Sequence, residues 1–172
     1  MHEIKHDGFR VIATRAGEKV KLFSRRGTDF TDRFPAAVAA ITAVRARSFV
    51  IDGEAIAVDQ NGLAVFEFLR GQRHDHVALL CAFDLLELDG EDLRRQPLET
   101  RKAALARLLG GAPVGLALNA HYEAEGAIVY PHACALGCEG IASKRKESPY
   151  RSGRALLAEG KEPERAGSHA RG

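Results

Sequence analysis

The first ten residues hold the clearest candidate for a nucleophile. In the stretch EIKHDGFR, Lys5 lies between two carboxylates, Glu3 and Asp7, and Gly8 follows. On a strand the three charged side chains would point to one face, because side chains alternate with a period of two. A lysine amine attacks only when neutral, so its pKa must fall from about 10.4 through burial or a nearby cation. By itself, this segment is better explained as a surface strand of alternating charge.

Four further segments place charged or aromatic residues beside apolar runs. They read LFSRRGT at 22–28, VIDGEA at 50–55, AFDLL at 82–86 and EGIASKR at 139–145. Each has an ordinary structural explanation, such as hairpin cations, strand-end acids or a core phenylalanine. Together with KHDG, in this order and spacing, they resemble the nucleotidyltransferase family of ATP-dependent DNA ligases and mRNA capping enzymes. The resemblance is strongest to the ligase domain of bacterial end-joining ligases (ligase D), and it extends from His2 to about Arg154.

The resemblance implies a role for each matching residue. Lys5 becomes the nucleophile that attacks the α-phosphate of ATP, releasing pyrophosphate and leaving a lysine–AMP phosphoramide. The implied ATP-binding residues are Glu3 at the adenine edge, Arg10 and Arg25 near the ribose or phosphate, Glu54 at the ribose hydroxyls, Phe83 stacked on adenine, and Lys144 at the α-phosphate. The implied ligands of Mg²⁺ (or Mn²⁺) are Glu54 and Glu139. These residue types suit a transfer that needs mainly positioning and charge neutralisation.

The function implied is that of an ATP-dependent DNA ligase acting in repair and recombination. AMP would pass from Lys5 to a DNA 5′-phosphate, with nicked or broken double-stranded DNA as substrate and a Ku-type end-binding protein as a further partner. Two alternatives remain. One is an RNA ligase or capping guanylyltransferase, which shares Lys-x-Asp-Gly. The other is an inactive nucleotide- or DNA-binding remnant of a split or truncated ligase gene.

The sequence departs from the family pattern in three places. Only four residues precede Lys5, where the family has a longer segment that completes the nucleotide pocket, so we expect a domain truncated at both ends. The family follows Tyr-Arg-Ser-Gly-Arg with a Trp-Leu-Lys-x-Lys segment that binds ATP phosphates, and this chain contains no tryptophan. The OB-fold domain that closes over ATP is also missing. We therefore expect the chain to adenylate itself poorly and to seal nicks very poorly, because phosphate-binding cations and domain closure accelerate such transfers.

The elements that must position these residues have the pattern of an α+β domain of antiparallel sheets with packed helices, the ATP-grasp-like core of DNA ligases without the OB-fold. Expected strands are 2–6, 8–14, 19–24, 48–52 and 54–58 on either side of Gly53, 77–88, 115–120 and 139–145. Expected helices are 36–44 with Thr31 or Asp32 as cap, 98–109 and 125–136. Turns are expected at 16–18, at Asn61-Gly62 and at Asp89-Gly90.

Composition sets the remaining limits. The chain has 172 residues, 45% hydrophobic and 28% charged, with a net charge of +2. We expect one adenylation domain at 1–154 and a disordered tail at 155–172, where Gly, Ala and charge mix without periodicity. No apolar run approaches the roughly 20 residues of a bilayer span, and the first residues lack an apolar signal region. The expected location is the cytoplasm, in association with the nucleoid and without a membrane partner.

Two other groups of residues could bind a metal. His132, Cys134 and Cys138 are spaced along an expected helix, but no second ligand pair follows, so buried helical thiols are the preferred interpretation. His74-Asp75-His76 lies in an expected polar loop, and we interpret it as solvated surface.

Overall fold

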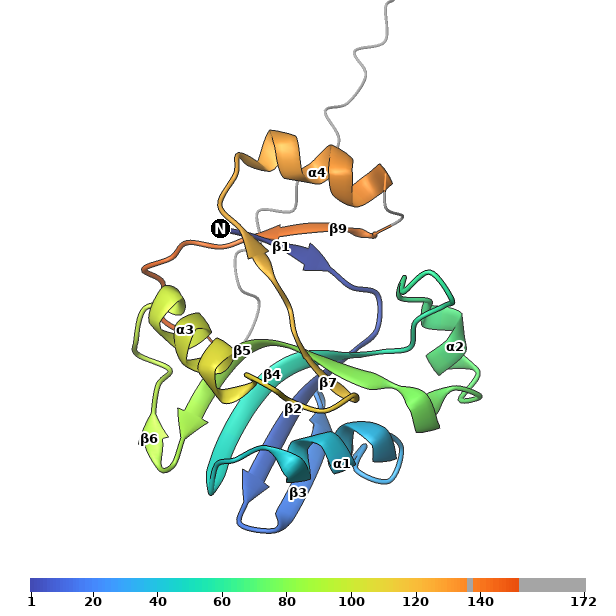
Figure 1. Ribbon diagram of the computed structural model, residues 1–172, viewed down its shortest axis with the longest axis vertical. Coiled ribbons are helices and arrows are strands. Elements are labelled where there is room, and N and C mark those ends of the chain that lie inside the picture. Colours follow the sequence, from blue (N-terminus) through green and yellow to red (C-terminus); the bar gives the residue numbers. More distant parts are fainter. Residues whose placement is uncertain (136–137, 152–172) are drawn as a thin grey trace, which may run out of the picture.

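Two β-sheets, one above the other, form the described part of the chain, residues 1–135 and 138–151, in a computed structural model (Figure 1). The small sheet has the strand order β8 (His121–Tyr122), β1 (His2–Lys5), β9 (Gly140–Ser143). The large sheet has the order β3 (Lys19–Ser24), β2 (Phe9–Ala16), β4 (Ser48–Ile56), β5 (Leu79–Leu88), β6 (Glu91–Asp92), and β7 (Leu116–Leu118) also pairs with β5. The helices are α1 (Pro35–Ala43), α2 (Phe66–Arg70), α3 (Leu98–Leu108), α4 (Gly126–Ala135) and the 3₁₀ helix η1 (Asp75–Val77).

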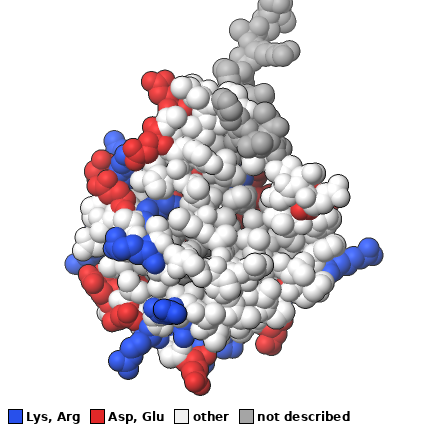
Figure 2. All heavy atoms as spheres, in the orientation of Figure 1, with Lys and Arg blue, Asp and Glu red and all other residues white. Residues whose placement is uncertain are grey.

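Helices cover the outer sides of both sheets. In Figure 1, α4 lies over the small sheet, while α1 lies beneath the large sheet and α3 packs beside β5. None of the helices in the described ranges has the length and hydropathy needed to cross a membrane. The face in Figure 2 carries acidic and basic side chains interspersed along its margins, with a mostly uncharged middle.

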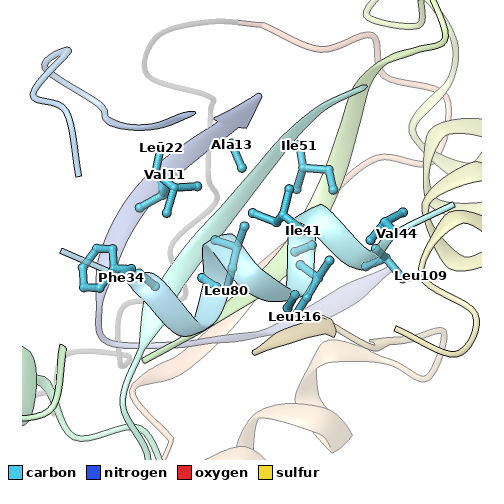
Figure 3. Packing of buried hydrophobic residues seen from close by; sticks show 14 of the residues in the cluster. Val11, Ala13, Leu22, Phe34, Ile41, Val44, Ile51, Leu80, Leu109 and Leu116 are labelled. Carbon is cyan, nitrogen blue, oxygen red and sulfur yellow. The ribbon is translucent and has the colours of Figure 1, made fainter. Parts of the chain in front are cut away.

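The hydrophobic core lies between the large sheet and α1. Alternate residues of the central strands point toward α1, and all of them are buried: Val11 and Ala13 from β2, Ile51 from β4, Leu80 and Leu85 from β5. Figure 3 shows Phe34, Ile41 and Val44, from α1 and its two ends, packed among these strand residues. Because strand side chains alternate between faces, the intervening residues of β2 and β4 point to the other face. That face carries Arg10 and Glu54.

Most of the expected elements are confirmed. The fold is α+β, and every strand pair is antiparallel except β5 with β7, which is parallel. The turn at Asp89-Gly90 has φ values of 47° and 89°, which is why this dipeptide suits a tight hairpin. Leu98, Leu105 and Leu109 are buried along α3 or at its end, as the leucine spacing predicts.

Three details of the predicted elements are wrong. The helix at 35–43 has neither Thr31 nor Asp32 as its cap; it begins at Pro35 after Phe34, and the Thr31 hydroxyl instead accepts a hydrogen bond from the Leu22 amide. The expected strand at 77–88 begins only at Leu79, because η1 occupies the residues before it. The short helix α2 was not expected from the sequence.

Gly8 has a structural role between β1 and β2. A Cβ atom at this position would lie 2.2 Å from the carbonyl oxygen of Ala55 on β4. Only glycine therefore permits the link after β1 to approach β4 this closely. The approach brings the strand that ends at Lys5 next to the polar face of the large sheet.

One buried ion pair fixes α3 to β5. Arg101 donates to both carboxylate oxygens of Asp84, at 2.7 and 2.9 Å, and its side chain is 2% exposed. A second arginine–aspartate pair of the same bidentate geometry, Arg94 with Asp92, is more than half exposed. The two pairs share this geometry but differ in burial, and Arg101 also donates to the carbonyls of Gln96 and Ser148.

We predict that Arg101→Met lowers the free energy of unfolding by about 3–5 kcal/mol, because it leaves the Asp84 carboxylate buried without its partner. Urea denaturation monitored by circular dichroism measures the change. Arg94→Met is the control, and we expect it to leave the urea midpoint unchanged because solvent screens that pair. Equal effects of the two substitutions would contradict the prediction.

Candidate active site

Lys5 lies at the end of β1, beside the start of β9. It pairs across the sheet with Gly140, and its Nζ lies 3.1 Å from Oε1 of Glu139. The Lys5 side chain is 40% exposed and that of Glu139 is 44% exposed. Both line a pocket of about 210 Å³, together with His6, Asp7, Leu63, Ala64 and Cys138. Lys5 is therefore reachable by a ligand that enters this pocket.

Glu3 occupies the same strand two residues earlier and is almost completely buried. Its Oε2 accepts a hydrogen bond of 2.6 Å from Nζ of Lys144, and its Oε1 lies 2.7 Å from Nζ of Lys102 on α3. One buried carboxylate thus holds two ammonium groups, one from the segment after β9 and one from the helix beside the large sheet.

Asn119 joins the two sheets beside this cluster. Its backbone N–H donates to the carbonyl of Ala82 on β5, and its side-chain amide donates to the carbonyl of Ile4 on β1. Its own carbonyl accepts from Lys102, and its Oδ1 lies 3.2 Å from Nε2 of His6. All the polar groups of Asn119 are used, so the residue fixes β1 against β5.

Phe83 stands at a bulge in the large sheet. Asp52 pairs with Asp84 and Gly53 with Ala82, so Phe83 is an additional residue on β5. Bulges redirect side chains and are frequent next to binding sites.

The Phe83 ring lies beside two cations and a large cavity. Nζ of Lys144 is 4.6 Å from the ring centroid, and Cζ of Arg10 is 5.5 Å from it. The three residues, with Tyr150, line a cavity of about 870 Å³, which lies within the usual size of small-molecule sites.

Arg10 and Tyr150 both bind the buried carboxylate of Asp52. Arg10 donates to Asp52 at 3.0 and 2.6 Å, and the Tyr150 hydroxyl donates at 2.8 Å. The hydrogen bond to Asp52 raises the pKa of Arg10. Burial, followed by the charge of Asp52, raises the pKa of Tyr150 to about 12. These contacts hold the segment after β9 against the polar face of the large sheet.

Glu54 is a half-buried carboxyl on this same face. Burial raises its pKa to about 8; the nearby positive charge of Arg10 opposes that shift, and the acids Asp52, Asp7 and Glu139 add to it. At neutral pH the carboxyl therefore holds a proton unless a bound cation stabilises its charge. Its position suits a ligand that brings positive charge.

The structure brings together most of the residues predicted from the sequence. Around the space between the two sheets lie Glu3, Lys5, Arg10, Glu54, Phe83, Glu139 and Lys144. Arg25 is different: it is exposed in the turn after β3, and within the described ranges no hydrogen bond or ion pair links it to these residues. Asp7 lies beyond the end of β1 and is exposed, so the expected alternation Glu3, Lys5, Asp7 stops at Lys5.

Three residues of the site were missed by the sequence reasoning: Lys102, Asn119 and Tyr150. A signal existed for Lys102, which lies four residues after Leu98 and three before Leu105, within the apolar stripe of α3. A lysine in such a stripe indicates a buried partner. Asn119 and Tyr150 carry no comparable local signal.

The predicted magnesium ligands, Glu54 and Glu139, could supply two carboxylates to a magnesium site but not a complete set of protein ligands. Among residues 1–135 and 138–151, no three or more His, Cys, Asp or Glu side chains are grouped so that they could hold a metal. Mg²⁺ is commonly held by one or two carboxylates together with substrate phosphates and water, so Glu54 and Glu139 fit that mode rather than a complete protein cage.

The structure bears differently on the two other groups of residues that could bind a metal. The side chains of His132 and Cys134 lie outside the described residues. The interpretation of His74-Asp75-His76 as solvated surface holds for His76, which is exposed, but is wrong for the other two residues: Asp75 is buried and pairs with Arg33 at 2.7 Å, and the His74 ring stacks on Phe68. Arg33 lies against three phenylalanine rings, which explains why a carboxylate is buried there.

Comparison with known proteins places the chain in a family. Residues 1–157 match the model of the "ATP dependent DNA ligase domain". A probable DNA ligase from Streptomyces griseus subsp. griseus is 43% identical over 118 residues, which are 62% of this chain and 23% of that protein. The multifunctional non-homologous end joining protein LigD from Pseudomonas aeruginosa is 34% identical over 158 residues, 89% of this chain and 19% of that protein.

A solved structure agrees with these matches. A mycobacterial DNA ligase D complexed with ATP and MES has a TM-score of 0.77 and 28% identity, covering 87% of this chain and 49% of that one. The chain spans only about a quarter or less of the length of the two relatives above. The family match nevertheless covers most of the chain, and the chain belongs to the family of ATP-dependent DNA ligase domains.

Proposed function

We propose that this chain carries out the adenylation step of an ATP-dependent DNA ligase, with Lys5 as the nucleophile. The observation that carries the proposal is the position of Lys5: at a strand end, partly exposed, in a pocket that it shares with Glu139. The larger cavity beside Phe83 would take the adenosine part of ATP.

The chemical step is a displacement at the α-phosphorus. The ammonium of Lys5 first loses one proton to solvent, and the lone pair of its nitrogen then forms an N–P bond. The nitrogen releases a second proton to solvent, which leaves the phosphoramide. The bond between the α-phosphorus and the oxygen that bridges to the β-phosphate breaks, and pyrophosphate leaves with that electron pair. Phosphoryl-type transfers depend on positioning and charge stabilisation, which Lys144 and Arg10 would supply on the nucleotide side.

Glu54 and Glu139 are the proposed ligands of Mg²⁺ or Mn²⁺. Bound there with the phosphates, the ion would neutralise charge on the leaving pyrophosphate. The pKa of Glu54 is raised to about 8, so this carboxyl ionises fully at neutral pH only when a cation is near. Glu139 would have to exchange Lys5 for the ion, which would also release the Lys5 amine from an ion pair that stabilises its charged form.

The proposed acceptor of the AMP group is the 5′-phosphate of nicked or broken double-stranded DNA. An oxygen of that phosphate would attack the α-phosphorus of lysine–AMP, breaking the N–P bond and regenerating Lys5. The family of the chain supports DNA as substrate. A Ku-type end-binding protein is a further proposed partner, supported by the likeness to a relative whose name describes non-homologous end joining.

We predict that incubation with ATP labelled at the α-phosphate and Mg²⁺ attaches label to the protein, and that Lys5→Ala reduces the labelling rate by about a thousandfold or more, because the attacking nitrogen is removed. Gel electrophoresis measures the label. Lys19→Ala, an exposed lysine on β3, is the matched control and should label like the wild type.

Other results of the same assay would point elsewhere. Persistent labelling of Lys5→Ala would refute the assignment of the nucleophile. Labelling by GTP in preference to ATP would favour a capping-type enzyme. No label with either nucleotide would indicate a protein that binds nucleotide or DNA without ligase chemistry.

We also predict that the chain loses stability as the pH rises from about 5 to 8.5, and that Glu54→Gln removes much of this loss. The pKa of Glu54 is raised from 4.5 when unfolded to about 8 when folded, so the folded state binds the extra proton between these values. The stabilisation is complete below the unfolded pKa and disappears as the pH rises through the folded pKa, at about 1.4 kcal/mol for each pKa unit.

Urea denaturation of wild type and Glu54→Gln at pH 5 and pH 8.5 measures this difference. Glu91→Gln, an exposed carboxylate on β6, is the control and should follow the wild type. Parallel pH profiles for wild type and Glu54→Gln would contradict the assigned role of burial at Glu54.

A further inference from the structure

Lys102 is an unusual residue to find in the interior of a protein. Its side chain is 2% exposed, although a buried ammonium is unfavourable unless charged and polar partners replace water. Its two partners are the Glu3 carboxylate at 2.7 Å and the Asn119 carbonyl at 2.9 Å. Lys102 does not line either of the two cavities, so it is not positioned to touch a ligand there.

Lys102 is nevertheless linked to the larger cavity through one carboxylate. Glu3 binds Lys102 through one oxygen and Lys144 through the other. The Lys144 side chain is 22% exposed, and it both lines the cavity and lies over Phe83. A ligand phosphate that binds the Lys144 ammonium therefore competes with Glu3 for it.

The effect of that exchange on Glu3 depends on Lys102. With Lys102 in place, Glu3 keeps one cation when Lys144 moves to a ligand. Without Lys102, the same movement would leave a carboxylate that is 2% exposed with no cation, which is strongly unfavourable. Lys144 would then stay bound to Glu3, and a nucleotide would lose a phosphate contact.

We propose that Lys102 is a positioning residue for nucleotide binding: by neutralising Glu3 from behind, it allows Lys144 to exchange Glu3 for a phosphate of the nucleotide. The inference rests on the proposed function in taking ATP as the nucleotide. Lys102 lies on α3, outside the segments that carry the family resemblance. This helix therefore has a part in setting the affinity of the site for ATP. Lys102 acts on ATP binding only through Glu3, so replacing Glu3 should remove the effect of replacing Lys102.

The test is a double-mutant cycle on ATP affinity. Lys102→Met, Glu3→Gln and the combined variant are prepared in a Lys5→Ala background, so that ATP is bound but not consumed. Calorimetric titration with ATP and Mg²⁺ gives the dissociation constants. We expect Lys102→Met to weaken ATP binding about tenfold when Glu3 is present. In the Glu3→Gln background we expect the same substitution to weaken binding by less than about twofold.

Matched variants separate positioning from structure. Lys102→Arg keeps the charge and should restore most of the affinity, while Lys21→Met, which removes a surface lysine paired with Asp29, should leave it unchanged. Urea denaturation checks that each variant folds. If Lys102→Met does not fold, Lys102→Gln retains a donor for Asn119 without the charge, and the same cycle applies to it.

Three outcomes would overturn the inference. The first is an equal loss of affinity in both backgrounds, which would indicate a structural effect or direct attraction by Lys102. The second is an unchanged affinity in Lys102→Met. The third is the absence of ATP binding in the Lys5→Ala parent. The proposed function is tested separately, by labelling the chain that retains Lys5. The labelling can fail while the double-mutant cycle succeeds, and the cycle can fail while the labelling succeeds.

Discussion

The arrangement of the site depends on one buried carboxylate, Glu3, and the ammonium of Lys102 that meets it from α3. The small sheet does not rest on the large one through an apolar interface, because the residues it turns inward include Glu3, Lys5 and the neighbouring Lys144. Its docking uses charged and polar groups, completed by Asn119. The Glu3 Oε1 atom meets Lys102 as an ion pair rather than through a hydrogen bond, so this part of the network is electrostatic. The location of Lys5 relative to the polar face of the large sheet follows from this set of contacts.

The parts of the fold that the sequence predicts are those set by neighbours along the chain. Alternation in β2 and β4 separates a core face from a polar face, and dipeptides such as Asp89-Gly90 require the left-handed φ values of a hairpin. The spacing of leucines predicts α3 for the same reason. The ordered motifs placed Lys5, Glu54 and Phe83 near one site, since a shared family pattern carries three-dimensional information that single segments lack.

The remaining features depend on contacts between distant segments. Tyr150 meets Asp52 across 98 positions, and Lys144 meets Glu3 across 141. Neither pairing can be read from the sequence, because the two members of each pair lie far apart along the chain. The same reason explains the error at Asp75, which looks like a loop residue until Arg33 is seen beside it. The bulge at Phe83 is also invisible in the sequence, because it is defined by the pairing of β5 with β4.

The cations of the site differ in how readily they can change partners. Lys5 and Glu139 are both about two-fifths exposed, so water screens their attraction and the pair is easily separated. Arg10 is held by a carboxylate that is fully buried and that also accepts from Tyr150, so Arg10 is fixed. Lys144 lies between these cases, because its partner Glu3 is buried but has a second cation. An entering polyanion would therefore meet a fixed guanidinium, an exchangeable ammonium over Phe83 and a loosely paired amine at Lys5. Exchange requires least at the proposed nucleophile, and this gradient follows from the burial of each carboxylate together with the number of partners that it has.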